Sequence, residues 1–194
     1  MLKEQRYIIL LLQEEQETYS NHINVKKQNI WYFPEITASV KDIQKFKIKN
    51  IENLKEVKTS VFEYYKDKYI SNKNISKPIR NIETKMDIEI WKSGINETFG
   101  NAKYYKNLST KQKKIKLITM DSLAKMIKYG KVRCNKASNY HKPNSLAEYY
   151  YLMHPILIDG IKYVVNMDIR KVPNTIGRFY IHSIQTKEAK IPGN

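Results

Sequence analysis

The chain lacks several features that define whole classes of protein. It has one cysteine, Cys134, in 194 residues, which excludes a disulfide framework or a cysteine-based zinc site within one chain. The apolar run Tyr7–Leu12 has six residues, too few to cross a bilayer. Glutamates follow that run and no small-residue cleavage site is present, so a signal peptide is not expected. We therefore expect a cytoplasmic protein with no membrane partner.

Acidic residues are scarce as well. Asp and Glu number 19 against 35 Lys and Arg, which gives a formal net charge of +16. Such an excess raises affinity for phosphate backbones. The densest stretch, residues 103–142, has eleven lysines and Arg133 against the single acid Asp121, with four tyrosines interleaved. Basic groups hold phosphates and aromatic rings stack on unpaired bases, so RNA is the expected partner, although a solvated lysine-rich face is an alternative.

Motifs for nucleotide and metal chemistry are also missing. The sequence has no Walker A, GxGxxG, HExxH or paired-cysteine pattern. Its carboxylates are too sparse and scattered to indicate a two-metal nuclease. We expect no cofactor and no metal, and any catalysis to be metal-independent.

The middle of the chain favours helices. Apolar residues three to four apart predict an amphipathic helix over residues 51–69. A short helix is expected over Ile95–Tyr105, followed by a basic connector at Lys111–Lys116. Thr119 is then expected to be the N-cap of a helix that ends at Gly130.

Strand patterns surround and follow these helices. Met86–Trp91 alternates apolar and acidic residues and predicts a strand that Ser93-Gly94 ends. Three β-rich runs close the chain, Glu148–Ile158, Ile161–Ile169 and Gly177–Thr186, the first two joined by the turn dipeptide Asp159-Gly160.

These patterns predict an α+β fold, in which N-terminal helices pack on a C-terminal antiparallel sheet of about four strands. Residues 1–37 are interpreted as an N-terminal extension and residues 38–194 as the main domain. Within the extension, Tyr7–Leu12 is either a strand or the first turns of a helix, because its periodicity cannot decide. The aromatic residues 31–33 are expected to pack on the main domain.

Histidine is the residue best suited to acid–base chemistry near neutral pH. His182 is the leading candidate, because strand alternation places Arg178 and Tyr180 on the same face of the last strand. His141, in a lysine-rich polar segment that would lower its pKa, is second. His154 precedes a proline inside a strand, which indicates an edge or a bulge.

A third group of candidates follows the strand at Met86–Trp91. In the segment IWKSGINETFGN, residues 90–101, glycine is expected to turn the chain and a helix to begin. Glu97 and Thr98 would then face a phosphate or a catalytic partner, while ordinary turn and capping chemistry is the alternative.

The order of the motifs IEIWKSGINETFGN, MDSLAKMIKYG, HPILIDGIKYVVNMDIRK and GRFYIHSI resembles the phage-associated domains of the barnase–EndoU–colicin–RelE-like (BECR) superfamily. Such domains occur in large polyvalent proteins of phages and conjugative elements. The resemblance covers about residues 40–186. It implies helices against a four-stranded antiparallel sheet and metal-independent RNA cleavage, with functional positions at Thr98, Glu97 and His182. Relatives often have a histidine or lysine near the end of the first motif, where this chain reads Glu-Thr-Phe-Gly.

The leading hypothesis is an RNA endonuclease of mobile-element or toxin type in the host cytosol, with a cognate immunity protein as a further possible partner. The catalytic candidates are His182, His141, Thr98, Glu97 and Tyr180. The substrate-binding candidates are Lys103, Arg133, Arg170, Arg178 and Lys92. The first alternative is a non-enzymatic, phage-encoded inhibitor that grips a host nucleoprotein such as a CRISPR effector. The third hypothesis is a nucleotide-directed transferase, but the sequence has no nucleotide-binding motif that would favour it.

Overall fold

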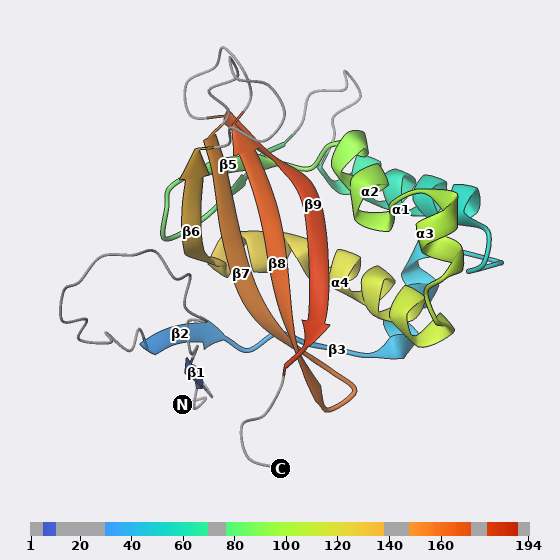
Figure 1. The fold of residues 1–194 in the computed structure, drawn as a ribbon, viewed down its shortest axis with the longest axis horizontal. Helices are drawn as coiled ribbons and strands as arrows, with labels where there is room; N and C mark the ends of the chain where they lie inside the picture. The colour runs from blue at the N-terminus through green and yellow to red at the C-terminus, as the bar shows by residue number, and fades with distance from the viewer. Residues whose placement is uncertain (1–5, 11–29, 70–76, 138–147, 172–177, 190–194) are drawn as a thin grey trace, which may run out of the picture.

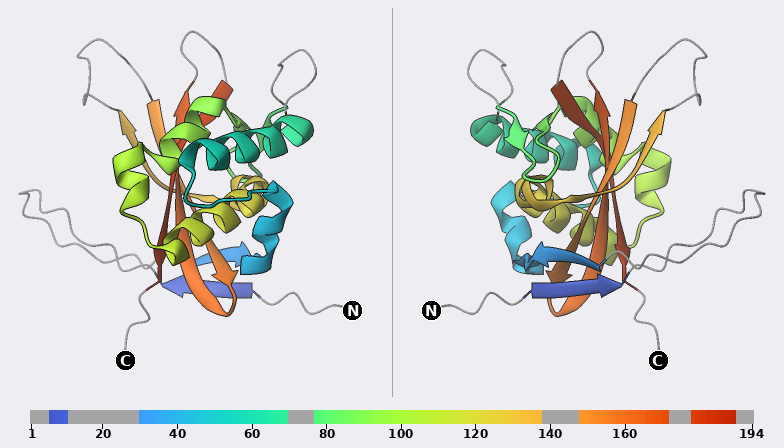
Figure 2. Two further views of the ribbon diagram at one scale, coloured as in Figure 1. Left: turned by 90° about the vertical axis from the view of Figure 1, so that its right-hand side faces the viewer. Right: turned by 90° about the vertical axis from the view of Figure 1, so that its left-hand side faces the viewer.

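A curled, mixed β-sheet with helices against one face and beside one edge forms the body of the protein (Figure 1). The computed structural model describes residues 6–10, 30–69, 77–137, 148–171 and 178–189. The helices lie behind the long strands and next to the last strand, and two views at right angles show this separation (Figures 1 and 2). The expected α+β class is confirmed.

Four long strands make an antiparallel meander at the centre of the sheet. They are β6 (Lys131–Ala137), β7 (Glu148–Ile158), β8 (Ile161–Lys171) and β9 (Arg178–Glu188). The three closing strands were predicted from their β-branched and aromatic residues, whereas β6 was not. A tight turn joins β7 to β8, where Asp159 and Gly160 have φ angles of +46° and +82°. Two successive left-handed residues match the twist of a hairpin.

The sheet is larger than the predicted four strands and is not purely antiparallel. β3 (Thr37–Ala38) pairs in parallel with β7, and β5 (Asp87–Glu89) pairs in parallel with β9. β4 (Ile79–Arg80) extends the β5 edge. The expectation of about four antiparallel strands is corrected, because short segments far away in sequence add to both edges.

A separate two-stranded sheet precedes the main one. It consists of β1 (Arg6–Leu10) and β2 (Ile30–Pro34), so the apolar run at Tyr7 contributes a strand rather than a helix. Phe33 of β2 is buried, and its ring meets the His154 ring edge-on at 5.1 Å between centroids. Packing of the aromatic cluster on the main domain is thus confirmed for Phe33.

Five helical segments lie among the described residues. They are η1 (Val40–Phe46, a 3₁₀ helix), α1 (Leu54–Tyr69), α2 (Lys92–Phe99), α3 (Ala102–Lys106) and α4 (Thr110–Tyr129). The amphipathic pattern over 51–69 correctly predicted α1, and its apolar positions Val57, Val61 and Tyr65 are buried.

The predicted start of α4 was wrong. The helix begins after Ser109, whose side chain accepts from the Gln112 backbone while the Gln112 side chain accepts from the Ser109 backbone. This reciprocal capping box satisfies two helix-end donors. Thr119 is an interior residue whose hydroxyl donates to the Ile115 carbonyl at 2.8 Å. The supposed connector Lys111–Lys116 is therefore helical, and Gly130 ends the helix as expected.

The expected turn at Ser93-Gly94 was also wrong, because both residues lie in the first turn of α2. Gly94 instead allows α2 to pack closely against β9. A Cβ atom there would sit 2.0 Å from the Ile181 carbonyl oxygen of β9, so any side chain would push α2 off the strand. Gly100, at φ +69°, then ends α2 and divides the predicted 95–105 helix into two.

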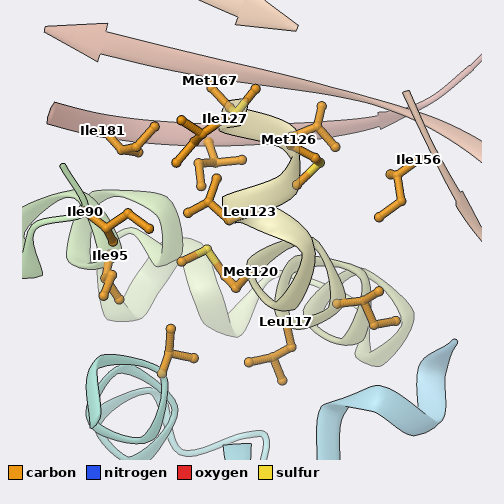
Figure 3. Packing of buried hydrophobic residues seen from close by; sticks show 14 of the residues in the cluster. Ile90, Ile95, Leu117, Met120, Leu123, Met126, Ile127, Ile156, Met167 and Ile181 are labelled. Atoms are coloured by element: carbon orange, nitrogen blue, oxygen red, sulfur yellow. The ribbon is translucent and has the colours of Figure 1, made fainter. Parts of the chain in front are cut away.

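The core lies between α4 and the sheet. Leu123, Met126 and Ile127 of α4 are fully buried and belong to one core cluster with Ile156, Met167 and Ile181 of the central strands (Figure 3). Burying one such side chain contributes about 1.5–3 kcal/mol. This packing fixes one face of β7, β8 and β9 and leaves the polar positions of β8, among them Asp168 and Arg170, on the other face.

Candidate functional site

A bulge in β9 sets the geometry of the site. Asp168 of β8 is opposite Ser183, and Ile169 is opposite Ile181, so His182 is the extra residue between them. A bulge leaves one residue out of the ladder, bends the strand and re-aims the neighbouring side chains. His182 is accordingly half-buried between two core residues of the same strand, Ile181 and Ile184.

An aromatic platform lies next to this bulge on the outer face of the sheet. The rings of Trp91 and Tyr180 are stacked, with centroids 4.2 Å apart and planes 6° from parallel. The Trp91 indole N–H donates to one Glu89 oxygen at 2.8 Å, and Arg178 donates to the other at 2.8 and 2.6 Å. Glu89 is only 4% exposed, so this buried carboxylate holds both the platform and the arginine.

Charged groups of β8 share the outer face. Arg170 is the register partner of Tyr180, and its guanidinium lies 3.8 Å from Asp168. Burial raises the pKa of Asp168, while the Arg170 charge opposes that rise. One Asp168 oxygen, Oδ1, is buried without a hydrogen-bond partner among the described residues. Leaving such a buried oxygen without a partner costs free energy.

The electrostatics of His182 reflect the same neighbours. Burial lowers its pKa below 6.5, the Arg170 cation lowers it further, and the Glu97 carboxylate of α2 raises it. The imidazole therefore lies within electrostatic reach of one cation and one carboxylate from two other elements. With its pKa lowered, it is mostly unprotonated at neutral pH and is suited to accept a proton.

A groove of about 1460 Å³ opens from His182 along β9. Its walls come from β9, from the C-terminal half of α2, from α3 and from the first half of α4. Glu97 and Asp168 line it together with His182. The histidine thus lies where the outer face of the sheet meets the groove.

The structure brings together five of the residues proposed from the sequence. They are His182, Glu97, Tyr180, Arg170 and Arg178. Thr98 also lines the groove, but it is buried and its hydroxyl donates to the Gly94 carbonyl at 2.8 Å. That bond is a side-chain-to-backbone bond within the helix, to the carbonyl four residues earlier, and we assign Thr98 a structural role.

Three other candidates lie elsewhere, and one lies outside the described residues. Lys103 is exposed on α3, and Lys92 lies over the Phe62 ring, 5.1 Å from its centroid. Arg133 is on β6, which β7 and β8 separate from β9. His141 falls outside the described residues.

Trp91, Glu89 and Asp168 were not proposed from the sequence as site residues. The alternation of Met86–Trp91 carried a signal, since it places Glu89 and Trp91 on one face. Their proximity to Tyr180 depends on the parallel pairing of β5 with β9. Residues about 90 positions apart in the chain become neighbours only through this pairing.

Within the described part of the chain, no three or more His, Cys, Asp or Glu residues form a group that could hold a metal ion. No helix in the same part is long and apolar enough to span a membrane.

The chain matches the model of a known protein family. The profile of large polyvalent protein-associated domain 3 matches residues 52–180, about two thirds of the sequence. This range includes α1 to α4, β4 to β8 and the start of β9. No curated protein and no solved structure matches the chain. The chain belongs to the large polyvalent protein-associated domain 3 family.

Proposed function

We propose that this member of the large polyvalent protein-associated domain 3 family is a metal-independent RNA endonuclease, of the mobile-element or toxin type and BECR-like in its chemistry. One observation carries the proposal: His182 at the β9 bulge has a cation, Arg170, and a carboxylate, Glu97, close enough to shift its pKa, beside the Trp91–Tyr180 platform. RNA cleavage through the 2′-hydroxyl needs a base, a positive charge for the phosphorane and a means of holding the nucleotide.

His182 is the general base in this proposal. Its unprotonated imidazole takes the proton of the 2′-hydroxyl, and the freed oxygen forms a bond to phosphorus. Glu97 stabilises the imidazolium that results, as its effect on the His182 pKa indicates. The bond to the 5′-oxygen breaks, and that oxygen takes a proton from water or from His141. The products are a 2′,3′-cyclic phosphate and a 5′-hydroxyl.

Arg170 stabilises the charge of the phosphorane. A guanidinium binds phosphate oxygens in a planar, two-point fashion, which a lysine cannot reproduce. The Trp91–Tyr180 pair holds a base next to the scissile phosphate, and Arg178 fixes the platform through Glu89. RNA is accordingly the proposed substrate, and an immunity protein that covers this face is a proposed partner.

The proposal is tested with end-labelled single-stranded RNA in EDTA. Wild-type protein should cleave it and leave ends that resist 3′ ligation, because they carry a cyclic phosphate. The same RNA with 2′-deoxyribose at the cleaved position should stay intact, since it lacks the nucleophile. Intact RNA after long incubation would overturn the proposal and would favour the non-enzymatic alternative, binding of a host nucleoprotein.

A pair of arginine variants separates the site from the general basic surface. Arg170→Met should reduce cleavage far more than Arg133→Met, because only Arg170 lies beside His182. Equal losses in both variants would indicate that positive charge acts without regard to position.

A further inference from the structure

The groove beside β9 continues well past His182. The strand runs on to Glu188, and six residue steps of extended chain span about 20 Å. Small-molecule pockets enclose roughly 300–1,000 Å³, and this groove exceeds them at about 1460 Å³. Its length and volume therefore suit a polymer better than a single small molecule.

One aromatic ring is held in place in the groove. Tyr104 of α3 is 47% exposed, and it lines the wall opposite β9. A Cβ atom on Gly100 would lie 2.6 Å from Tyr104 Cδ1, so only glycine lets the ring rest against this backbone. Asn101 caps the helix by accepting from the Tyr104 backbone N–H at 2.9 Å. An exposed ring that is already ordered loses little conformational entropy when a base stacks on it.

Lysines line the groove together with this ring. Lys116 Nζ donates to the Thr98 carbonyl at 2.8 Å and lies 5.5 Å from the Tyr104 centroid. Lys58 Nζ donates to the Gly100 carbonyl at 2.7 Å. At the far end, Lys111 lies 3.8 Å from Glu188 and spans the groove between α4 and β9. Lysines thus occur along the length of the groove, together with the carboxylates Glu97, Asp168 and Glu188.

We propose that this groove binds single-stranded RNA that continues from the scissile phosphate, with a base stacked on Tyr104 and phosphates beside Lys116, Lys58 and Lys111. The inference rests on the proposed function for the position of that phosphate at His182. An aromatic ring between lysines fits unpaired bases, whereas paired bases in an A-form duplex have no free ring face to offer. An extended protein strand paired with β9 is the competing occupant.

Binding of RNA that cannot be cleaved tests the groove independently of catalysis. A short fluorescein-labelled RNA with 2′-O-methyl groups lacks the nucleophile, so fluorescence anisotropy measures affinity alone. Tyr104→Ala should weaken binding about tenfold, in the range expected for one base–aromatic stack. Tyr104→Phe should restore wild-type affinity, since it keeps the ring. Ile161→Ala, an exposed apolar residue at the β7–β8 turn, is the matched control and should not change it.

Each result has a defined meaning. Unchanged affinity in Tyr104→Ala, or binding of the same sequence as a duplex at equal strength, overturns the groove proposal and favours a protein strand on β9. If Tyr104→Ala weakens binding while wild-type protein leaves unmodified RNA intact, the groove proposal stands and the proposed cleavage fails. If cleavage occurs but Tyr104→Ala has no effect, only the groove proposal fails.

Discussion

His154 and His182 lie on strands of the same sheet, separated only by β8, yet their surroundings differ in kind. His154 is fully buried, with its ring against Phe33 and Nδ1 donating to the Pro155 carbonyl at 2.5 Å. Its other nitrogen, Nε2, has no hydrogen-bond partner among the described residues. His182 is half-buried and lines an open groove near a cation and a carboxylate.

Strand pairing explains the difference. Along the edge that faces away from β8, β7 pairs with β6 as far as Met153 and with β3 from Leu157. The segment His154-Pro155 lies in the gap between these two partner strands. A proline is tolerated there because no neighbour needs its missing N–H. His182 instead stands at a bulge, where α2 comes close. The imidazole is the same in both places, and the partners within reach decide what it can do.

The largest expected effect separates these two histidines by function. His182→Gln should lower RNA cleavage by about 10²–10⁴-fold, the usual contribution of general acid–base catalysis, without lowering the melting temperature. His154→Gln should lower the melting temperature, because it places a polar amide in a packed site. It should leave the cleavage rate per folded molecule unchanged, because the groove stays intact. Cleavage rates per folded molecule and thermal melts check both variants. A large loss of cleavage in folded His154→Gln would remove the distinction.

The second effect concerns acid stability and belongs to His154. Burial lowers the pKa of His154 to about 4, while an unfolded histidine titrates near 6.5. The unfolded state therefore binds the proton first as pH falls, and the native state loses about 3 kcal/mol between pH 6.5 and 4. His154→Leu should make the free energy of unfolding less dependent on pH in the upper part of this window. Urea titrations at several pH values measure it, and an unchanged slope would assign the acid sensitivity to other groups.

A third effect tests how the site is assembled. Gly94→Ala should destabilise the protein by about 1–3 kcal/mol, because the new methyl group meets the Ile181 carbonyl and overpacks the α2–β9 contact. Because α2 carries Glu97, cleavage should fall as well, even in protein that remains folded. Ala124→Gly, at a half-buried position in α4, gives a control of comparable destabilisation without a change in α2.

The smallest effect is a shift in pH dependence. As a base, His182 requires its unprotonated form, so cleavage should fall only when pH drops through its lowered pKa. Arg170→Met removes a cation and should move this acid limb to higher pH. Glu97→Gln removes a carboxylate and should move it to lower pH. Shifts in the same direction would show that neither group acts on His182 through charge.

Local patterns in the sequence predicted much of the fold. Period-two alternation and the Asp159-Gly160 dipeptide located the closing strands, and three-to-four spacing located α1, because side-chain direction follows the backbone period. The start of α4 was misplaced because Thr119 and Ser109 both have the chemistry of a cap. Only the structure, in which Thr119 packs into the core and Ser109 forms the capping box, showed which of them begins the helix.

The sequence by itself determined the positive charge, the α+β class and the shared face of Arg178 and Tyr180. Those features follow from composition and from neighbours in the chain. The tertiary structure alone decided that His182 is a bulge residue near Glu97, that Trp91 stacks on Tyr180, and that Tyr104 faces β9 across a groove. Each depends on strand pairing or helix packing between distant segments, and no local spacing encodes such contacts.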